Sequence, residues 1–177
     1  MALYLIEAIL VNLQPEQIQQ SLEKVAREAA GEQAQLIEAQ IGEDLQRLLV
    51  VIEALNPAIA QRSFEAGGFT LTVLKQVRLI GQDLTTVKLR QGKANYLVEW
   101  NLPTGLTMDA YLQRKAEKSP LYAQVPDVTF ERPYVCEDLS KCLCFYDSPD
   151  EATVKQAREV VGAPIDRLTL IRNLQEA

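Results

Sequence analysis

Three cysteines lie close together in a stretch that is typical of a β-hairpin with a polar loop. Cys136 ends the first predicted arm, and Cys142 and Cys144 follow in the second. If Cys136 pairs opposite Cys142, the alternation of side chains along a strand places all three sulfurs on one face of a sheet. Three neighbouring thiolates would suit a soft metal such as copper(I) or zinc, and they could also serve in redox chemistry.

A second interpretation of the cysteines comes from an internal repeat with a spacing of 92 residues. This spacing maps Cys142 onto Val50 and Cys144 onto Ile52, which are ordinary core residues. A free cysteine in a core behaves as a small hydrophobic residue. We therefore favour a helix-packed core position for the cysteines, and the metal or redox site remains the alternative.

Carboxylates form the second group of residues that could do chemistry, because two apolar residues followed by glutamate recur along the chain. The four copies are Leu5-Ile6-Glu7, Leu36-Ile37-Glu38, Val51-Ile52-Glu53 and Leu97-Val98-Glu99.

Strand alternation predicts that Glu7, Glu53 and Glu99 point away from the helix-packed face, with Arg47 on the same side. Such carboxylates could bind a hard cation, pair with arginine, or act as general bases with raised pKa values. We favour solvated or salt-bridged glutamates, since glutamate is rarely buried without a partner. The alternative is a ligand cavity between two sheets, lined by these three glutamates and Arg47.

The composition excludes several classes of protein. The 177 residues include no histidine, so Ser-His and Cys-His catalytic pairs are excluded. A net charge of −6 and a pI near 4.8 argue against a nucleic-acid partner. We find no phosphate-binding glycine loop, no stretch long and apolar enough to span a membrane, and no signal peptide, so we expect a cytoplasmic protein.

The repeat also organises the elements that must position these residues. Tyr4-Leu5-Ile6-Glu7 is echoed by Tyr96-Leu97-Val98-Glu99, and Asn56-Pro57 by Ser148-Pro149. Each half has the pattern strand, helix, strand, strand, helix, strand. The first half is predicted as strands 2–11, 33–41, 45–55 and 69–80 with helices 15–30 and 57–66, and the second as strands 94–102, 127–136, 141–147 and 166–174 with helices 107–118 and 149–161.

These elements predict an α+β protein of two tandem ferredoxin-like βαββαβ units, at residues 1–81 and 94–177. A structured linker, 82–93, joins them and contains a β-like stretch from Thr85 to Arg90. Each antiparallel sheet would carry its helices on one face. Because the strands are apolar on both faces, we expect the open faces to pack on each other or on another subunit, which favours a homo-oligomer.

Residues 128–171 resemble the DUF4242 family, a small bacterial domain of unknown function with a ferredoxin-like fold. The resemblance is carried by Val128-Thr129-Phe130-Glu131-Arg132, by Cys144-Phe145-Tyr146-Asp147-Ser148-Pro149-Asp150-Glu151 and by Gly162-Ala163-Pro164. It implies this fold and self-association. Some members are described as nickel-binding, with histidines in the helix before the Gly-x-Pro turn. Here that position is Ala157, and imidazole is the natural ligand for nickel, so we do not expect nickel. We expect no cofactor, and a metal held by the cysteines remains the alternative.

Three functions follow from these observations. We favour a non-enzymatic module that binds a small molecule or mediates protein contacts, because it needs none of the missing residues. The second is a cofactor-independent enzyme of the dimeric α+β barrel type that uses strand glutamates as bases. The third is a metal-binding or redox protein that uses the cysteine thiolates.

Overall fold

The computed structural model describes residues 1–174, and its elements follow one another in the predicted order. The last three residues of the predicted second unit, 175–177, lie outside the described residues. The strands are β1 (Ala2–Ile9), β2 (Gln35–Gly42), β3 (Arg47–Ala54), β4 (Leu71–Leu79), β5 (Tyr96–Asn101), β6 (Thr129–Cys136), β7 (Lys141–Asp147) and β8 (Arg167–Arg172). The helices are α1 (Pro15–Gly31), α2 (Pro57–Glu65), α3 (Leu84–Arg90), α4 (Met108–Lys118) and α5 (Glu151–Val160), with 3-10 helices η1 (Gln91–Lys93) and η2 (Ser119–Gln124).

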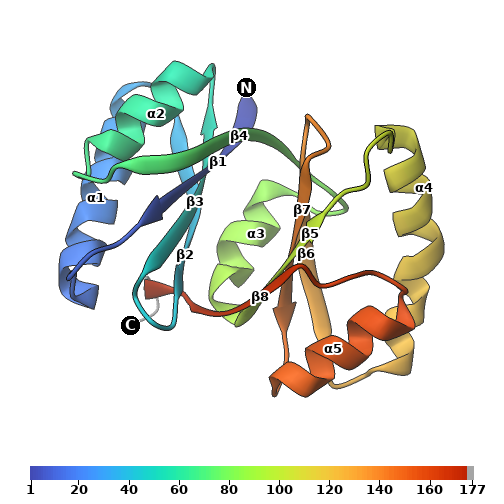
Figure 1. The fold of residues 1–177 in the computed structure, drawn as a ribbon. Helices are drawn as coiled ribbons and strands as arrows, with labels where there is room; N and C mark the ends of the chain where they lie inside the picture. Colours follow the sequence, from blue (N-terminus) through green and yellow to red (C-terminus); the bar gives the residue numbers. More distant parts are fainter. Residues whose placement is uncertain (175–177) are drawn as a thin grey trace.

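The strands form one closed antiparallel barrel in the order β1-β3-β2-β8-β5-β7-β6-β4 (Figure 1). The prediction of two separate open ferredoxin-like sheets is therefore wrong. The sheets join at their edges, where β2 pairs with β8 through Ile41 and Arg172, and β4 pairs with β6 through Val77 and Cys136. The physical reason is that an edge strand carries unpaired backbone groups, and closure satisfies them.

Closure also explains why the strands are apolar on both faces. On β3, Val50 and Ile52 point outward to the helices, whereas Leu49 and Val51 point into the barrel. The inner faces are thus covered within one chain and do not require a second subunit. The barrel interior is filled by the buried residues Leu5, Ile37, Leu49, Val51, Val77, Val87, Ala94, Leu97, Tyr134, Cys136, Leu143, Phe145 and Ile171.

Helices cover the outer faces of the barrel on opposite sides (Figure 1). The helix α1 begins at Pro15, whose missing N–H costs nothing in the first turn, and it buries an apolar stripe that includes Ile18, Leu22 and Val25. With α2 it covers the first half. The helices α4 and α5 and the 3-10 helix η2 cover the outer face of β5 and β7, and this second layer carries the pocket described below.

The linker contains a helix where we predicted a β-like stretch. The run of β-branched residues from Thr85 suggested a strand, but Asp83 caps a helix by accepting a hydrogen bond from the Thr86 N–H at 2.7 Å. Val87 is completely buried in the barrel cluster. Figure 1 places this helix, α3, between the two groups of strands. Burial of Val87 and the Asp83 cap thus outweigh β propensity.

Candidate functional site

The structure brings together three of the four residues predicted from the carboxylate pattern. Arg47 on β3 donates to Glu7 on β1 at 2.7 Å and to Glu99 on β5 at 2.8 Å. Arg47 contacts both oxygens of Glu99, and Lys141 on β7 donates at 2.9 Å to the oxygen that the Arg47 Nη2 also contacts. Glu53 lies half-buried at the opposite end of β3, and no ion pair found within residues 1–174 joins it to this group. The group therefore links the two halves of the barrel at one mouth.

The charges in this group hold Glu99 in its ionised form. Burial by itself would raise the pKa of Glu99, but the hydrogen bonds and positive charges of Arg47 and Lys141 outweigh burial and lower it. A paired carboxylate with a lowered pKa is a poor general base. A depression of about 350 Å³ opens beside the group and is lined in part by Glu7, Arg47 and Arg167.

A second ion pair lies inside the barrel, and the sequence did not single it out as a site. Arg132 on β6 donates twice to Glu38 on β2, at 2.9 and 2.6 Å, and Tyr134 donates to the same carboxylate at 2.5 Å. Register shifts between Leu36 and Glu38 and between Phe130 and Arg132 allow both charged side chains to face inward. The glutamate pattern included Glu38, but its bulge could not be deduced from strand alternation.

The cysteines divide between the two faces of the barrel wall. Because Val135 pairs opposite Cys142, Cys136 points into the barrel interior, whereas Cys142 and Cys144 point outward to the helices. The prediction that all three sulfurs share one face is wrong, since it assumed a register shifted by one residue. The prediction of a helix-packed core position is confirmed for Cys142 and Cys144 and is wrong for Cys136.

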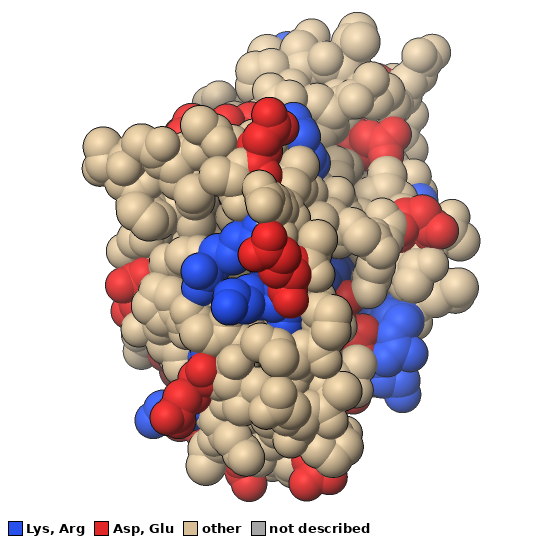
Figure 2. Space-filling model, turned by 90° about the vertical axis from the view of Figure 1, so that its right-hand side faces the viewer, with Lys and Arg blue, Asp and Glu red and all other residues tan. Residues whose placement is uncertain are grey.

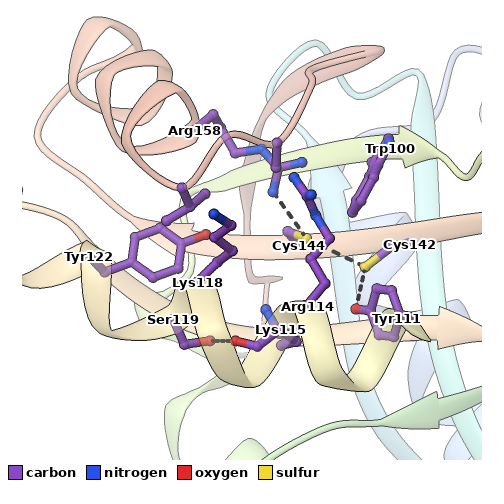
Figure 3. Close-up of a pocket in the computed structure, with 12 residues that line it drawn as sticks. Trp100, Tyr111, Arg114, Lys115, Lys118, Ser119, Tyr122, Cys142, Cys144 and Arg158 are labelled. Atoms are coloured by element: carbon purple, nitrogen blue, oxygen red, sulfur yellow. Dashed lines mark hydrogen bonds between the residues drawn. The ribbon is translucent and has the colours of Figure 1, made fainter. Parts of the chain in front are cut away.

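The two outward cysteines form the floor of a pocket between the β5–β7 wall and the helices α4, η2 and α5 (Figure 3). Their sulfurs are 3.5 Å apart, and the Tyr111 hydroxyl lies 2.9 Å from the Cys142 sulfur. The cavity has a volume of about 40 Å³. Its lining comprises Trp100, Tyr111, Arg114, Lys115, Lys118, Ser119, Tyr122, Cys142, Cys144, Arg158, Val161 and Ala163.

Arg158 is the most deeply buried charge of this pocket, with 3% of its surface exposed. Its guanidinium donates to the Cys144 sulfur at 3.5 Å, to the Tyr146 hydroxyl at 3.1 Å and to the Pro164 carbonyl at 2.6 Å. Its Nε has no acceptor within residues 1–174, and no ion pair of the described chain joins Arg158 to a carboxylate. A buried guanidinium without a carboxylate is costly, so an anion beside it is strongly favoured.

Other cations surround the same cavity. The half-buried Lys115 ammonium lies 3.8 Å from the centre of the Phe130 ring, and Arg114 lies over Trp100. Lys118 is exposed at the rim. No acidic side chain is among the described residues that line the pocket. On the face of the molecule seen in Figure 2, basic side chains gather beside acidic ones.

This environment shifts the pKa values of the Cys142 and Cys144 thiols in opposite directions. The hydrogen bond from Cys142 lowers the pKa of Cys144, burial opposes that effect, and the positive charges of Arg158 and Lys115 lower the pKa further. The same sulfur–sulfur contact and burial raise the pKa of Cys142. Burial lowers the pKa of Lys115 and raises that of Tyr122 to about 12. The arrangement therefore favours one thiolate, at Cys144, beside one neutral thiol.

Local sequence explains how the helices bring these cations to the wall. The helix α4 is capped by Thr107, whose hydroxyl accepts from the Ala110 N–H at 3.1 Å, and α5 is capped in the same way by Asp150. Sequence reasoning missed Arg158. The available signal was its position in the apolar stripe that also contains Val154 and Ala157, where a charged residue is unusual.

Comparisons with known proteins support the fold of the whole chain and give a family match for its second half. The structure of a protein provisionally described as a chlorite dismutase matches with a TM-score of 0.61 and 11% identity, covering 99% of this chain and 97% of that one. A protein from Lactobacillus acidophilus, provisionally described as a monooxygenase, matches with a TM-score of 0.52 and 12% identity, covering 98% and 93%. At these identities the likeness shows a common barrel fold alone.

The family comparison concerns the second half of the chain. Residues 96–171 match the family described as nickel responsive protein SCO4226-like. The match includes the stretch on which we based the DUF4242 resemblance, and it supports a small domain family there, although not under that name. No curated protein matches the sequence. No helix among residues 1–174 is long and apolar enough to cross a membrane.

Proposed function

We propose that this protein binds a small anion in the pocket between the β5–β7 wall and the helices α4, η2 and α5. The observation that supports this proposal is the buried guanidinium of Arg158, which has no carboxylate partner among residues 1–174. Lys115 adds a second positive charge on the same cavity. Positive groups held in a water-poor pocket attract an anion more strongly than the same groups in water.

The size of the cavity restricts the ligand. A water molecule needs about 10–15 Å³ of such volume, so about 40 Å³ holds a few waters or one small anion. Trp100, Tyr111 and Tyr122 line the pocket with aromatic surface. We therefore propose an inorganic oxyanion or a small carboxylate as the class of ligand.

This proposal keeps the binding-module hypothesis and relocates its site. The strand glutamates are less suited to an enzyme, because Glu7 and Glu99 are held by Arg47 and the pKa of Glu99 is lowered. The barrel between the sheets is filled with side chains. Two proteins provisionally described as enzymes have the same fold, and at 11% and 12% identity that likeness concerns the fold alone.

The residues do not fit nickel, although the family matched by the second half is described as nickel responsive. The chain contains no histidine. No group of three or more histidine, cysteine or carboxylate side chains within residues 1–174 could hold a metal ion. Two cations face the paired sulfurs, and their charge opposes a metal cation at that place. A site with this charge suits an anion.

Calorimetric titration of the reduced protein with nitrite, sulfite, phosphate, bicarbonate and formate would test the proposal. We expect at least one of these anions to bind, and Arg158→Met to weaken that binding at least tenfold, since a hydrogen bond to a charged group contributes about 1.5–3 kcal/mol. Arg62→Met is the matched control, because Arg62 is half exposed and pairs with Glu32 on the far side of the first half. Failure of every anion to bind, or equal binding by both variants, would refute the proposal.

Lys115 provides a second comparison in the same assay. Lys115→Met should weaken binding, whereas Lys155→Met, which removes an equal charge from the exposed face of α5, should not. If the two variants weaken binding equally, the affinity reflects the net charge of the molecule and the pocket is not its source.

A further inference from the structure

We propose that Cys144 and Cys142 form a reversible redox pair, in which a small hydroperoxide oxidises Cys144 and Cys142 then closes a disulfide. The inference uses the pocket of the proposed function, but it does not require an anion to bind there. It rests on the contact between the two sulfurs at 3.5 Å and on the guanidinium of Arg158, which lies 3.5 Å from Cys144.

The charges around Cys144 make it the nucleophile of the pair. A thiolate, and not a thiol, attacks peroxides, and nearby cations favour the thiolate. Arg158 and Lys115 both act on Cys144, and the pKa of this residue is lowered. The pKa of Cys142 is raised, so it keeps its proton until it reacts. A pair with one thiolate and one neutral thiol has a nucleophile and a resolving residue in contact.

The chemistry balances with the peroxide as oxidant. The Cys144 thiolate attacks one peroxide oxygen, the O–O bond breaks, and the leaving oxygen takes a proton and departs as water or an alcohol. Cys144 is then a sulfenic acid, oxidised by two electrons. The Cys142 sulfur attacks the Cys144 sulfur, the S–O bond breaks, and the hydroxide leaves with the Cys142 proton as water. The Tyr111 hydroxyl, 2.9 Å from the Cys142 sulfur, can donate to that sulfur as its proton leaves.

Strand geometry indicates that this disulfide would be easily reduced. Residues two apart on a strand have Cα atoms about 6.6–6.8 Å apart, at the upper end of the range that a disulfide spans. Closing the bond therefore strains β7, and strained disulfides are the labile kind. A dithiol reductant can return the pair to the thiol form and complete a cycle.

The cavity selects the oxidant by size, because both sulfurs are reached through it. Cys142 and Cys144 are 1% and 2% exposed, and about 40 Å³ of open volume lies beside them. Hydrogen peroxide is little larger than water and fits this volume, whereas bulky hydroperoxides do not. Cys136 is equally buried, but it faces the packed barrel interior and burial raises its pKa. It is therefore an internal control.

The test exposes the reduced, full-length protein to hydrogen peroxide and then alkylates the remaining thiols after denaturation. Peptide mass spectrometry should show that Cys142 and Cys144 escape alkylation together while Cys136 is alkylated, and that dithiothreitol restores both. tert-Butyl hydroperoxide should react at least tenfold more slowly. In the unmutated protein, equal oxidation of all three cysteines, or oxidation of Cys144 without a disulfide, would overturn the inference.

Variants separate the roles of the three cysteines. Cys142→Ser should accumulate a sulfenic acid on Cys144 that dimedone traps, Cys144→Ser should abolish the reaction, and Cys136→Ser should react like the parent protein. Cys144→Ser keeps Arg158 and Lys115, so it should still bind an anion in the reduced titration. If the parent protein binds an anion but forms no Cys142–Cys144 disulfide with peroxide, this inference alone is refuted. If it forms the disulfide but binds no anion, only the proposed function is refuted.

Discussion

Replacing Arg158 with methionine tests whether the buried guanidinium maintains a thiolate at Cys144. At their separation of 3.5 Å, an effective dielectric constant of about 20 gives an attraction of about 4–5 kcal/mol. Lys115 and Cys142 remain in Arg158→Met and also lower the pKa of Cys144. We therefore expect a rise of about 1–3 pKa units, the range observed for loss of one opposite charge.

The pKa of Cys144 can be measured from the ultraviolet absorbance of its thiolate. The difference between the titrations of the parent protein and Cys144→Ser isolates this residue, and the same difference is measured in the Arg158→Met background. Arg62→Met serves as the control for a surface guanidinium. An unchanged titration midpoint in Arg158→Met would refute the argument that Arg158 holds the thiolate.

The same perturbation changes the pH dependence of stability. Because the folded pKa of Cys144 lies below its ordinary value of 9.0, its ionisation contributes stability that is fully present above pH 9.0. That contribution is lost as the pH falls through the lower folded pKa. Arg158→Met should reduce this contribution by about 1.4 kcal/mol for each unit by which the pKa rises. Denaturant unfolding at several pH values would measure it, and parallel pH profiles would contradict the prediction.

Three further predictions concern the barrel. Arg47→Met should lower the free energy of unfolding by about 3–5 kcal/mol in denaturant titrations, because it leaves Glu99 buried without its main partner, whereas Lys155→Met should change it little. Because the folded pKa of Glu99 is lowered, its ionisation contributes stability that is fully present above pH 4.5 and is lost as the pH falls through the folded pKa. The free energy of unfolding of Arg47→Met should therefore depend less steeply on pH in this range. An unchanged pH profile would count against the pairing. Asp83→Ala should lower the free energy of unfolding, because the Thr86 N–H loses its cap, and an unchanged free energy of unfolding would mean that the cap does not stabilise α3.

Much of the secondary structure could be predicted, because local signals specify it. Pro15 and the apolar stripe after it predicted α1, and the continuous apolar run around Val50 predicted β3 as a strand buried on both faces. The internal repeat placed Cys142 and Cys144 against helices, as the structure has them. The prediction of a β-like stretch from Thr85 was wrong. Its β-branched residues indicate a strand, and only the burial of Val87 and the Asp83 cap favour a helix.

The candidate pocket could be predicted only in part. The sequence indicated Cys142 and Cys144 as candidates, but the cations that give them their chemistry come from α4 and α5, the helices that precede and follow the β6–β7 hairpin. Arg158 reaches Cys144 only because α5 packs on the outer face of β7. Sequence spacing does not report such a contact.

The sequence by itself determined the order of strands and helices, the absence of histidine chemistry and the two-sided apolar strands, since each depends on residue type and local periodicity. Tertiary structure decided how those strands were covered. Pairing of β2 with β8 and of β4 with β6 closed one barrel, because hydrogen bonding at the edges satisfies backbone groups that separate sheets would leave unpaired. It also decided the register of β6 against β7, and with it which cysteines meet Arg158, since a one-residue shift moves every side chain to the other face.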